Sequence, residues 1–244
     1  MISVCMATYN GEQYLRKQLN SILGQLAPED ELIISDDSST DATLGIIRSF
    51  NDTRIRLLEG NCAHSPIYNI ENALKDAPGK ILVLADQDDI WLDNKLSVVR
   101  EKLKEKTERP ALVMMNGYII DAKGKRTGQT IYSRKAPKNG VLTNLYDNCF
   151  TGCTIAFTRR LLELALPFPP GIPMHDSWLG ILALLQGEVE FSTEKTMEYR
   201  RHGANLSYRR RNPLQQVSWR LCLGYHLWQR CHRKKSHATS PKIL

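Results

Sequence analysis

The sequence predicts an α/β protein in which helices cover both faces of a mostly parallel sheet. Short apolar runs alternate with amphipathic segments through residues 1–115, and polar clusters follow several of these runs. With 42% hydrophobic residues and only 15 glycines and 11 prolines, the chain can form a packed core and is unlike low-complexity disordered sequences. Its 244 residues fit one large domain, or one domain with an appendage.

The first half of the chain alternates regularly between the two element types. Apolar runs of four to six residues indicate buried strands, and apolar side chains at helical spacing indicate the helices between them. Strands are expected at Ile2–Ala7, Glu31–Ser35, Arg54–Leu58, Ile81–Ala85 and Ala111–Met115. Helices are expected at Glu12–Gln25, from a cap at Ser39 and Thr40 to Phe50, at Ile67–Ala77 and at Leu92–Lys106.

The second half is less regular. Lys123–Gly140 is polar and glycine-containing and is expected to be a surface loop, and the proline-rich stretch Pro167–Pro173 is expected to be an irregular connection. The remaining elements are a strand at Thr154–Phe157, helices at Arg159–Leu166 and Asp176–Gln186, and short strands near Val189–Phe191 and Met197–Tyr199.

Polar clusters follow three of the expected strands: Thr8-Tyr9-Asn10-Gly11, then Asp36 to Asp41, then Asp86-Gln87-Asp88-Asp89. Ligands of such sheets bind beyond the carboxyl ends of the strands, so these clusters are expected to share one site. Three carboxylates within four residues repel one another unless a cation is present. Mg²⁺ or Mn²⁺, completed by a substrate diphosphate, suits these hard oxygen ligands. The alternative is a solvated turn in which Asp89 caps the helix that begins near Trp91.

The acidic pair after the second strand also allows two interpretations. Asp36 and Asp37 can belong to an ordinary helix start, because Ser38 to Asp41 resembles one. Alternatively, a carboxylate accepts the N3–H of a pyrimidine while Tyr9 packs against the base. Neither G-x-G-x-x-G nor G-x-x-x-x-G-K-[ST] is present, which disfavours dinucleotide enzymes and P-loop NTPases.

Composition also narrows the cellular context. The longest apolar run, Trp178 to Leu185, is too short to span a bilayer, and the N-terminus does not resemble a secretory signal. Six cysteines without a C-x-x-C pair indicate free thiols in a reducing cytosol rather than a zinc site. Eleven of the 33 basic residues lie after Glu198, where no acidic residue occurs, so the two parts of the chain are expected to face different partners.

Five stretches carry a family resemblance. The order and spacing of ISVCMATYNGEQYLRKQLNSIL, ELIISDDSSTDAT and ILVLADQDDIW resemble the family-two inverting glycosyltransferases with a GT-A fold. The form DQDDIW, with the later MHDSW and YRRHGANLS, is most similar to bacterial transferases of O-antigen and capsule synthesis, many of them rhamnosyltransferase-like. The resemblance covers most of residues 1–205. It implies a GT-A domain over residues 1–212, with a nucleotide-sugar half (1–115) and an acceptor half (116–212).

The resemblance also implies roles for individual residues. The donor nucleotide is expected to contact Thr8, Tyr9, Asn10, Asp36, Asp37 and Asp86. Asp88 or Asp89 is expected to bind the metal ion, Mn²⁺ or Mg²⁺, and His202 is a further metal ligand or phosphate contact, unless it is merely structural. Arg200, Arg201 and Arg209–Arg211 neutralise phosphate or are solvated charge. Asp176 is expected to be the catalytic base, with a helix N-cap as the alternative, and Trp178 stacks on the acceptor sugar or belongs to the core.

The expected reaction is a single displacement that inverts the anomeric carbon of a nucleoside-diphosphate sugar, linked to UDP or dTDP. Rhamnose, galactose, glucose and N-acetylglucosamine all fit the motifs. The expected acceptor is a saccharide, lipid-linked in cell-surface polysaccharide synthesis. Two competing functions are a sugar nucleotidyltransferase, which normally opens with a Gly- and Arg-rich loop absent here, and an inactive saccharide-binding or scaffold protein on the same fold.

The basic C-terminal segment, residues 213–244, is expected to form an amphipathic helix. Leu214, Val217, Leu221, Tyr225 and Trp228 recur at helical spacing, with Trp219, Leu223 and Leu227 widening the same face. Such a basic helix with tryptophan is typical of membrane-surface elements and suits a cytoplasmic enzyme at the inner face of the membrane. The alternatives are packing on the catalytic domain and a homodimer contact. No nucleic-acid partner is expected, because no recognition motif accompanies the charge.

Overall fold

The computed structural model describes residues 1–203 and 212–236 and shows an α/β fold. The strands are β1 (Ile2–Thr8), β2 (Glu31–Asp36), β3 (Ile55–Leu58), β4 (Ile81–Asp86), β5 (Ile90–Trp91), β6 (Ala111–Ile120), β7 (Arg126–Thr130), β8 (Ile155–Thr158) and β9 (Glu188–Arg200). The helices are α1 (Leu15–Leu23), α2 (Thr43–Ser49), α3 (Pro66–Asp76), α4 (Lys95–Leu103), α5 (Ile131–Arg134), α6 (Val141–Tyr146), α7 (Arg159–Ala165), α8 (His175–Gln186) and α9 (Pro213–Ser236), with 3₁₀ turns η1 (Lys104–Lys106) and η2 (Gly152–Thr154).

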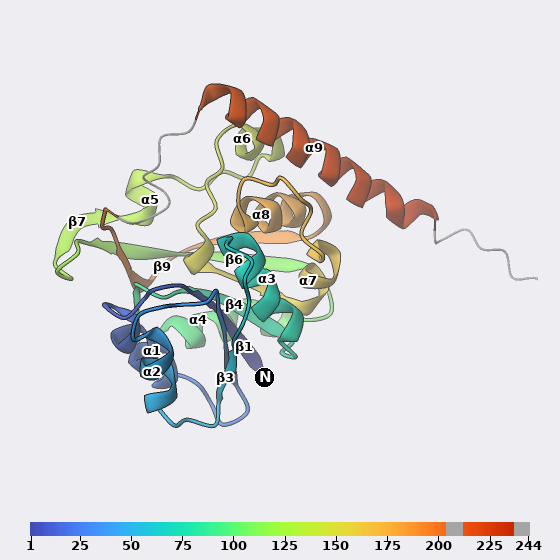
Figure 1. Ribbon diagram of the computed structural model, residues 1–244. Helices are drawn as coiled ribbons and strands as arrows, with labels where there is room; N and C mark the ends of the chain where they lie inside the picture. The colour runs from blue at the N-terminus through green and yellow to red at the C-terminus, as the bar shows by residue number, and fades with distance from the viewer. Residues whose placement is uncertain (204–211, 237–244) are drawn as a thin grey trace, which may run out of the picture.

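One sheet runs through the molecule in the order β3-β2-β1-β4-β8-β6-β9-β5, and β7 pairs with β6 (Figure 1). The four strands from β3 to β4 are parallel, as the alternating sequence pattern predicts. Beyond β4 the sheet is mixed, because β8 is antiparallel to both of its neighbours, β4 and β6. The prediction of a helix-covered α/β sheet is therefore confirmed, and its parallel character is confined mainly to the first half.

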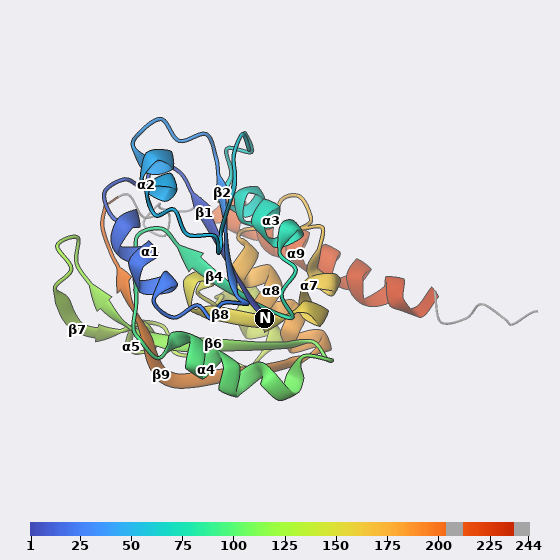
Figure 2. The ribbon, with the colours of Figure 1, turned by 90° about the horizontal axis from the view of Figure 1, so that it is seen from below.

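Two hydrophobic clusters fill the spaces above and below the sheet. Successive side chains of a strand point to opposite faces, so Val4 and Met6 join one cluster and Cys5 joins the other. Helices α1, α2 and α4 cover the face of Val4, and α3, α7 and α8 cover the face of Cys5 (Figure 2). The helices expected in these places are confirmed, with bounds that differ by a few residues.

Several local expectations are wrong. Residues 123–140 contain β7 and α5 rather than only a loop, and the two short strands expected near 189 and 197 are one continuous strand, β9. Strand β9 pairs with β6 with two register shifts, and the pairing includes the polar segment in the middle of β9. Ser39 and Thr40 do not cap α2, whose N-cap is Ala42. Asp89 does not cap the following helix either, because α4 begins at Lys95 after the cap Asn94.

Helix α9 crosses over α6 and α8 (Figure 1). Leu223 and Leu227 are buried in the cluster shared with α8, and Arg230 donates to the carbonyls of Leu164 and Leu166 beside α7. The two leucines therefore face the domain. The sequence pattern predicts that they widen the apolar stripe of Leu214 to Trp228. This prediction is wrong, because that stripe lies on the exposed side of the helix.

Candidate active site

The register of the parallel strands brings the polar clusters to one edge of the sheet. Central strand β1 pairs with β2 so that Thr8 lies opposite Asp36, and with β4 so that Ala7 lies opposite Asp86. Neighbouring strands are about 4.8 Å apart, so the acidic residues of β2 and β4 flank the end of β1. The expectation that these clusters converge is thus met by the backbone pairing alone.

Asp36 anchors the first polar loop. Its buried carboxylate accepts hydrogen bonds from Thr8 Oγ1 (2.8 Å), Ser39 Oγ (2.7 Å) and the Ser39 amide (2.8 Å). Ser39 Oγ in turn accepts from the amide of Asn10 at 2.9 Å. Thr8, Asn10 and Asp36 therefore form one connected network that fixes the loop after β1 against the loop after β2.

Asp37 is buried beside this network and accepts hydrogen bonds from the amides of His64 (3.0 Å) and Ser65 (3.1 Å). A carboxylate has about four acceptor positions, so these two bonds leave capacity for a further donor. Tyr9, in contrast, is 55% exposed. The pair offers a fixed acceptor and an accessible aromatic ring, as recognition of a pyrimidine base requires.

Gln87 ties the loop after β1 to the loop after β4. Its side chain accepts from the amide of Tyr9 and donates to the carbonyl of Tyr9, both at 2.9 Å. The contact needs a glycine beside it, because a Cβ on Gly11 would lie 2.4 Å from Gln87 Oε1. The middle residue of Asp86-Gln87-Asp88 thus positions the loop after β1, a role that the sequence pattern does not reveal.

The three carboxylates after β4 occupy different environments. Asp86 is solvent-accessible, but desolvation by the surrounding protein, followed by the charges of Asp88 and Asp176, raises its pKa to about 7. Asp89 is fully buried; burial, followed by the charges of Asp88 and Asp86, raises its pKa well above the usual range. Asp89 Oδ1 accepts from the Arg200 amide at 2.8 Å, whereas Oδ2 is buried without a hydrogen-bond partner among the described residues.

His202 and Arg200 reach the same cluster from the end of β9. His202 Nε2 lies 2.7 Å from Asp88 Oδ2, and its ring packs at 5.2 Å from that of Tyr14. The buried Arg200 donates to the carbonyl of Asp88 (2.7 Å) and stacks on Tyr14. Arg200 therefore supports the acidic loop, which accounts for its conformation without a phosphate. Arg209–Arg211 lie outside the described residues.

Asp176 joins the cluster from the start of α8. Its charge contributes to the raised pKa of Asp86, and Asn148 Nδ2 donates to Asp176 Oδ1 at 3.3 Å. The N-cap of α8 is Met174, so the alternative interpretation of Asp176 as a cap is wrong. Trp178 is fully buried and donates to the carbonyl of Ala165 at 3.0 Å, which makes it a core residue and not an acceptor platform.

The cluster fits a divalent cation. Asp86, Asp89 and Cys153 place ligand atoms within 4.8 Å of one another, and His202 holds Asp88 beside them. The carboxylates offer hard oxygen ligands of the kind that Mg²⁺ and Mn²⁺ prefer. Asp89 Oδ2, which is buried without a hydrogen-bond partner among the described residues, fits the position of a metal ligand, because buried polar atoms are otherwise hydrogen-bonded.

Sequence reasoning missed four contributors to this site: Gln87, Lys95, Asn148 and Cys153. Lys95 is fully buried, and its ammonium donates to the carbonyl of Cys153 at 2.6 Å. A signal for Lys95 was present, because it precedes Val98 and Val99 by three and four residues and so lies on the buried stripe of α4.

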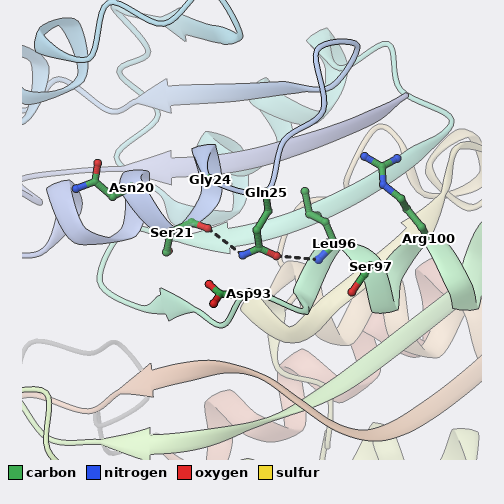
Figure 3. A pocket seen from close by; sticks show the side chains of 8 residues that line it. All are labelled: Asn20, Ser21, Gly24, Gln25, Asp93, Leu96, Ser97 and Arg100. Atoms are coloured by element: carbon green, nitrogen blue, oxygen red, sulfur yellow. Dashed lines mark hydrogen bonds between the residues drawn. The ribbon is translucent and has the colours of Figure 1, made fainter.

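A separate hollow of about 340 Å³ lies between α1 and α4, away from the acidic cluster. Figure 3 shows Asp93 and Gln25 at this hollow, with Arg100 on the next turns of α4. Its lining is polar and shares no residue with the carboxylates described above. Asp93 therefore provides an acidic side chain close in sequence to the cluster but in different surroundings.

Comparison with known proteins gives a consistent family. The model described as Glycosyl transferase family 2 matches residues 3–164. The chain is 31% identical over 186 residues to the UDP-Glc:alpha-D-GlcNAc-diphosphoundecaprenol beta-1,3-glucosyltransferase WfgD of Escherichia coli, covering 75% of this chain and 70% of WfgD.

Solved structures show the same fold. S. aureus TarS 1–349 in complex with UDP-GlcNAc has a TM-score of 0.65 at 23% identity, covering 89% of this chain and 66% of that one. Glucosyl-3-phosphoglycerate synthase from Mycobacterium tuberculosis, with Mn²⁺, UDP and phosphoglyceric acid, has a TM-score of 0.55 at 21% identity, covering 95% and 78%. The chain thus spans about two thirds of the TarS structure.

Proposed function

The chain belongs to glycosyl transferase family 2 and has the GT-A fold, and from this premise we propose that it is a metal-dependent inverting transferase. It moves a sugar from a nucleoside diphosphate, UDP or dTDP, to a lipid-linked saccharide acceptor during cell-surface polysaccharide synthesis. WfgD carries the relevant precedent in its name, which gives UDP-Glc as donor and a diphosphoundecaprenol-linked sugar as acceptor. Among the four candidate donor sugars, this precedent favours glucose.

One observation carries this proposal. Asp176, from the second half of the chain, lies close enough to Asp86 for its charge to raise the pKa of that carboxyl. A cluster suited to a metal–diphosphate complex and a separate carboxylate suited to proton transfer therefore share one site, as an inverting displacement requires. Family membership disfavours the nucleotidyltransferase alternative, and the complete set of acidic residues disfavours a scaffold without activity.

The donor is held by the loops after β1 and β2. Asp37 accepts the N3–H of the base, and the accessible ring of Tyr9 packs against its face. Thr8, Asn10 and Asp36 act together, because their hydrogen bonds fix the loop that carries Tyr9. Asp86, at the rim of the cluster, faces the ribose and diphosphate side of the donor.

Asp88 and Asp89 would hold the metal ion, with His202 next to Asp88. When bound, Mn²⁺ or Mg²⁺ stabilises the negative charge that develops on the leaving diphosphate. Asp176 removes the proton of the acceptor hydroxyl while that oxygen attacks the anomeric carbon from the face opposite the diphosphate. Asn148 orients Asp176 for this step through its hydrogen bond to Oδ1.

A donor panel tests the proposal. UDP-glucose, UDP-galactose, UDP-N-acetylglucosamine and dTDP-rhamnose are incubated with Mn²⁺ and a diphosphoundecaprenol-linked sugar, and nucleoside diphosphate release is measured. Release of UDP or dTDP with extension of the lipid-linked acceptor is expected for one donor. Release of pyrophosphate from a nucleoside triphosphate, without transfer from any nucleotide sugar, would contradict the proposal.

Helix α9 bears on the proposal that the acceptor is linked to a lipid. Leu214, Val217, Leu221, Tyr225 and Trp228 form an apolar stripe, each between 51% and 79% exposed. The stripe faces away from the domain, because Leu223 and Leu227 on the other side of the helix are buried. None of the described helices is long and apolar enough to cross a membrane.

We assign this stripe to the surface of a lipid bilayer. Tryptophan and tyrosine prefer the boundary between lipid and water, and a helix lying in that boundary buries only one face. Leu142 and Tyr146 of α6 are also exposed beside α9, where Arg220 stacks on Tyr146 at 4.6 Å. Because Arg220 and Arg230 contact the domain, apolar side chains rather than these two charges face the lipid. The side chains of Arg233, Lys234 and Lys235 lie outside the described residues.

Vesicle co-sedimentation tests the lipid assignment. The full chain is expected to bind vesicles of phosphatidylglycerol and phosphatidylethanolamine, and the double variant Leu221→Gln/Trp228→Gln is expected to lose most of this binding. Leu185→Gln, which changes an exposed leucine of α8, serves as the control and keeps it. A dimer that the double variant disperses, with no vesicle binding by the wild type, would assign the stripe to a second copy instead.

A further inference from the structure

Lys95 carries a positive charge into the protein interior directly behind the proposed metal site. It is 0% exposed, and no other lysine among the described residues is classed as buried. Its ammonium donates to the carbonyl of Cys153 at 2.6 Å, lies 3.6 Å from Met197 Sδ and sits 4.3 Å above the ring of Trp91. All of these partners are uncharged, so hydrogen bonding alone does not neutralise the ammonium.

The charges that compensate Lys95 are those of the acidic cluster. Burial lowers the pKa of Lys95 to about 8, while Cys153, Asp89 and Asp86 oppose that shift. An isolated ammonium in the interior would cost several kcal/mol, a cost that nearby carboxylates reduce. Lys95 is also connected to the cluster through Cys153. It donates a hydrogen bond to the carbonyl of Cys153, and the sulfur of Cys153 lies beside Asp86 and Asp89.

We infer that Lys95 is a built-in counterion for the metal-binding carboxylates, and that its charge lowers the affinity of the cluster for divalent cations. This inference rests on the proposed metal-dependent transfer. Asp86, Asp88 and Asp89 bring three negative charges together when ionised, and Lys95 offsets one of them from the interior side. The cluster can then fold without a metal ion and release one together with the product, which a cluster of uncompensated carboxylates would hold too tightly.

Arg200 does not perform the same task. Its guanidinium donates to the carbonyls of Asp88, Asp121 and Ala122 and stacks on Tyr14, so it is engaged on the β9 side of the loop. Lys95 comes from α4, and its ammonium contacts η2 through the carbonyl of Cys153. The two cations therefore support the acidic loop from different elements, and Lys95 alone is fully enclosed.

A metal titration tests the inference without an activity assay. Free Mn²⁺ is measured by electron paramagnetic resonance in wild type and in Lys95→Met, which removes the charge and keeps an unbranched side chain. The Mn²⁺ dissociation constant is expected to fall roughly tenfold in Lys95→Met, since a unit charge near a divalent ion is removed. The rise in melting temperature caused by Mn²⁺ is expected to be larger in the variant, and its metal-free melting temperature lower.

Four further variants separate charge from packing. Lys104→Met removes an exposed charge just after α4, and Leu96→Ala creates a cavity on α4 without a change of charge; both are expected to keep the wild-type Mn²⁺ dissociation constant. Lys95→Arg keeps the charge and should stay within threefold of wild type. Lys95→Gln replaces Lys95→Met, under the same criterion, if the latter does not fold.

The outcomes are distinct. An unchanged or weaker Mn²⁺ affinity in the neutral variant overturns the counterion role of Lys95 and leaves the proposed function intact. The same holds if Lys95→Arg changes the affinity as much as the neutral variant, because packing would then be the cause. Wild-type protein that binds no Mn²⁺ at all overturns both the inference and the metal-dependent mechanism.

Discussion

The acidic pair after β2 and the acidic cluster after β4 lie on either side of β1, yet their carboxylates are satisfied in different ways. Asp36 accepts three hydrogen bonds and Asp37 two, all from nearby hydroxyl and amide groups. In the cluster, one buried oxygen of Asp89 has no hydrogen-bond partner in the part of the chain that the structure describes, and the pKa values of Asp86 and Asp89 are raised. The first pair is held by hydroxyl and amide donors of the protein, whereas the second is organised for a positive charge that the protein only partly supplies.

Among single substitutions, the largest expected effect concerns Asp176, which comes from α8 and not from either acidic loop. Asp176→Asn is expected to lower the transfer rate by roughly 10²- to 10⁴-fold, the usual contribution of a general base. UDP binding, measured by calorimetry with Mn²⁺ present, should stay within threefold of wild type, because Asp176 does not hold the nucleotide. Transfer at the wild-type rate would remove Asp176 from the mechanism.

Substitution within the metal-binding cluster has the next largest expected effect. EDTA is expected to abolish turnover, and Asp88→Asn is expected to lower it by roughly 100-fold even at high Mn²⁺, because charge stabilisation of the leaving group is lost. Asp93→Asn, at the separate hollow between α1 and α4 (Figure 3), is the control and should retain its activity. Turnover that is indifferent to chelation would show that the cluster does not act through a metal ion.

Stability sharpens the comparison between the two acidic sites. Asp36→Asn should lower the free energy of unfolding by about 1 to 3 kcal/mol, because three donors lose a charged acceptor. Asp89→Asn should raise the metal-free stability, because it relieves repulsion within the cluster, and should reduce the stabilisation by Mn²⁺. Urea denaturation with and without Mn²⁺ distinguishes the two variants. Equal responses of both variants would contradict the difference between the two acidic sites.

At neutral pH the smallest expected effect comes from His175, beside the proposed base. Burial lowers its pKa from 6.5 to about 4, so the unfolded chain binds a proton at a higher pH than the folded protein does. Stability is therefore lost as pH falls from about 6.5 to 4, by up to about 3 kcal/mol. His175→Gln should flatten this part of the stability profile measured by urea denaturation; an unchanged profile would mean that His175 titrates normally.

Much of the donor half follows from the sequence because its determinants are local. Apolar runs and helical periodicity locate β1, β2 and β4, and the rule for parallel strands then brings Thr8, Asp36 and Asp86 together. The acceptor half depends on contacts distant in sequence. Strand β9 passes through a polar segment because β6 supplies its hydrogen bonds, and no local pattern marks that pairing.

The burial of individual polar residues was equally hidden. Lysine is almost always exposed, so the sequence does not predict the burial of Lys95, although its position matches the apolar stripe of Val98 and Val99. In α9, apolar residues occur on both faces, and only the contacts of Leu223 and Leu227 show which face the domain covers. Periodicity identified the helix without indicating its orientation.

The central claim is that carboxylates after β4 gather around one divalent ion beside the donor diphosphate. A crystal structure with Mn²⁺ and UDP, with anomalous diffraction collected for manganese, tests it most directly. A single manganese peak coordinated by Asp88 or Asp89 and by the diphosphate, with the uracil against Asp37, is the result expected. Bound UDP with no manganese at the cluster, or with the ion at an unrelated site, would contradict the claim.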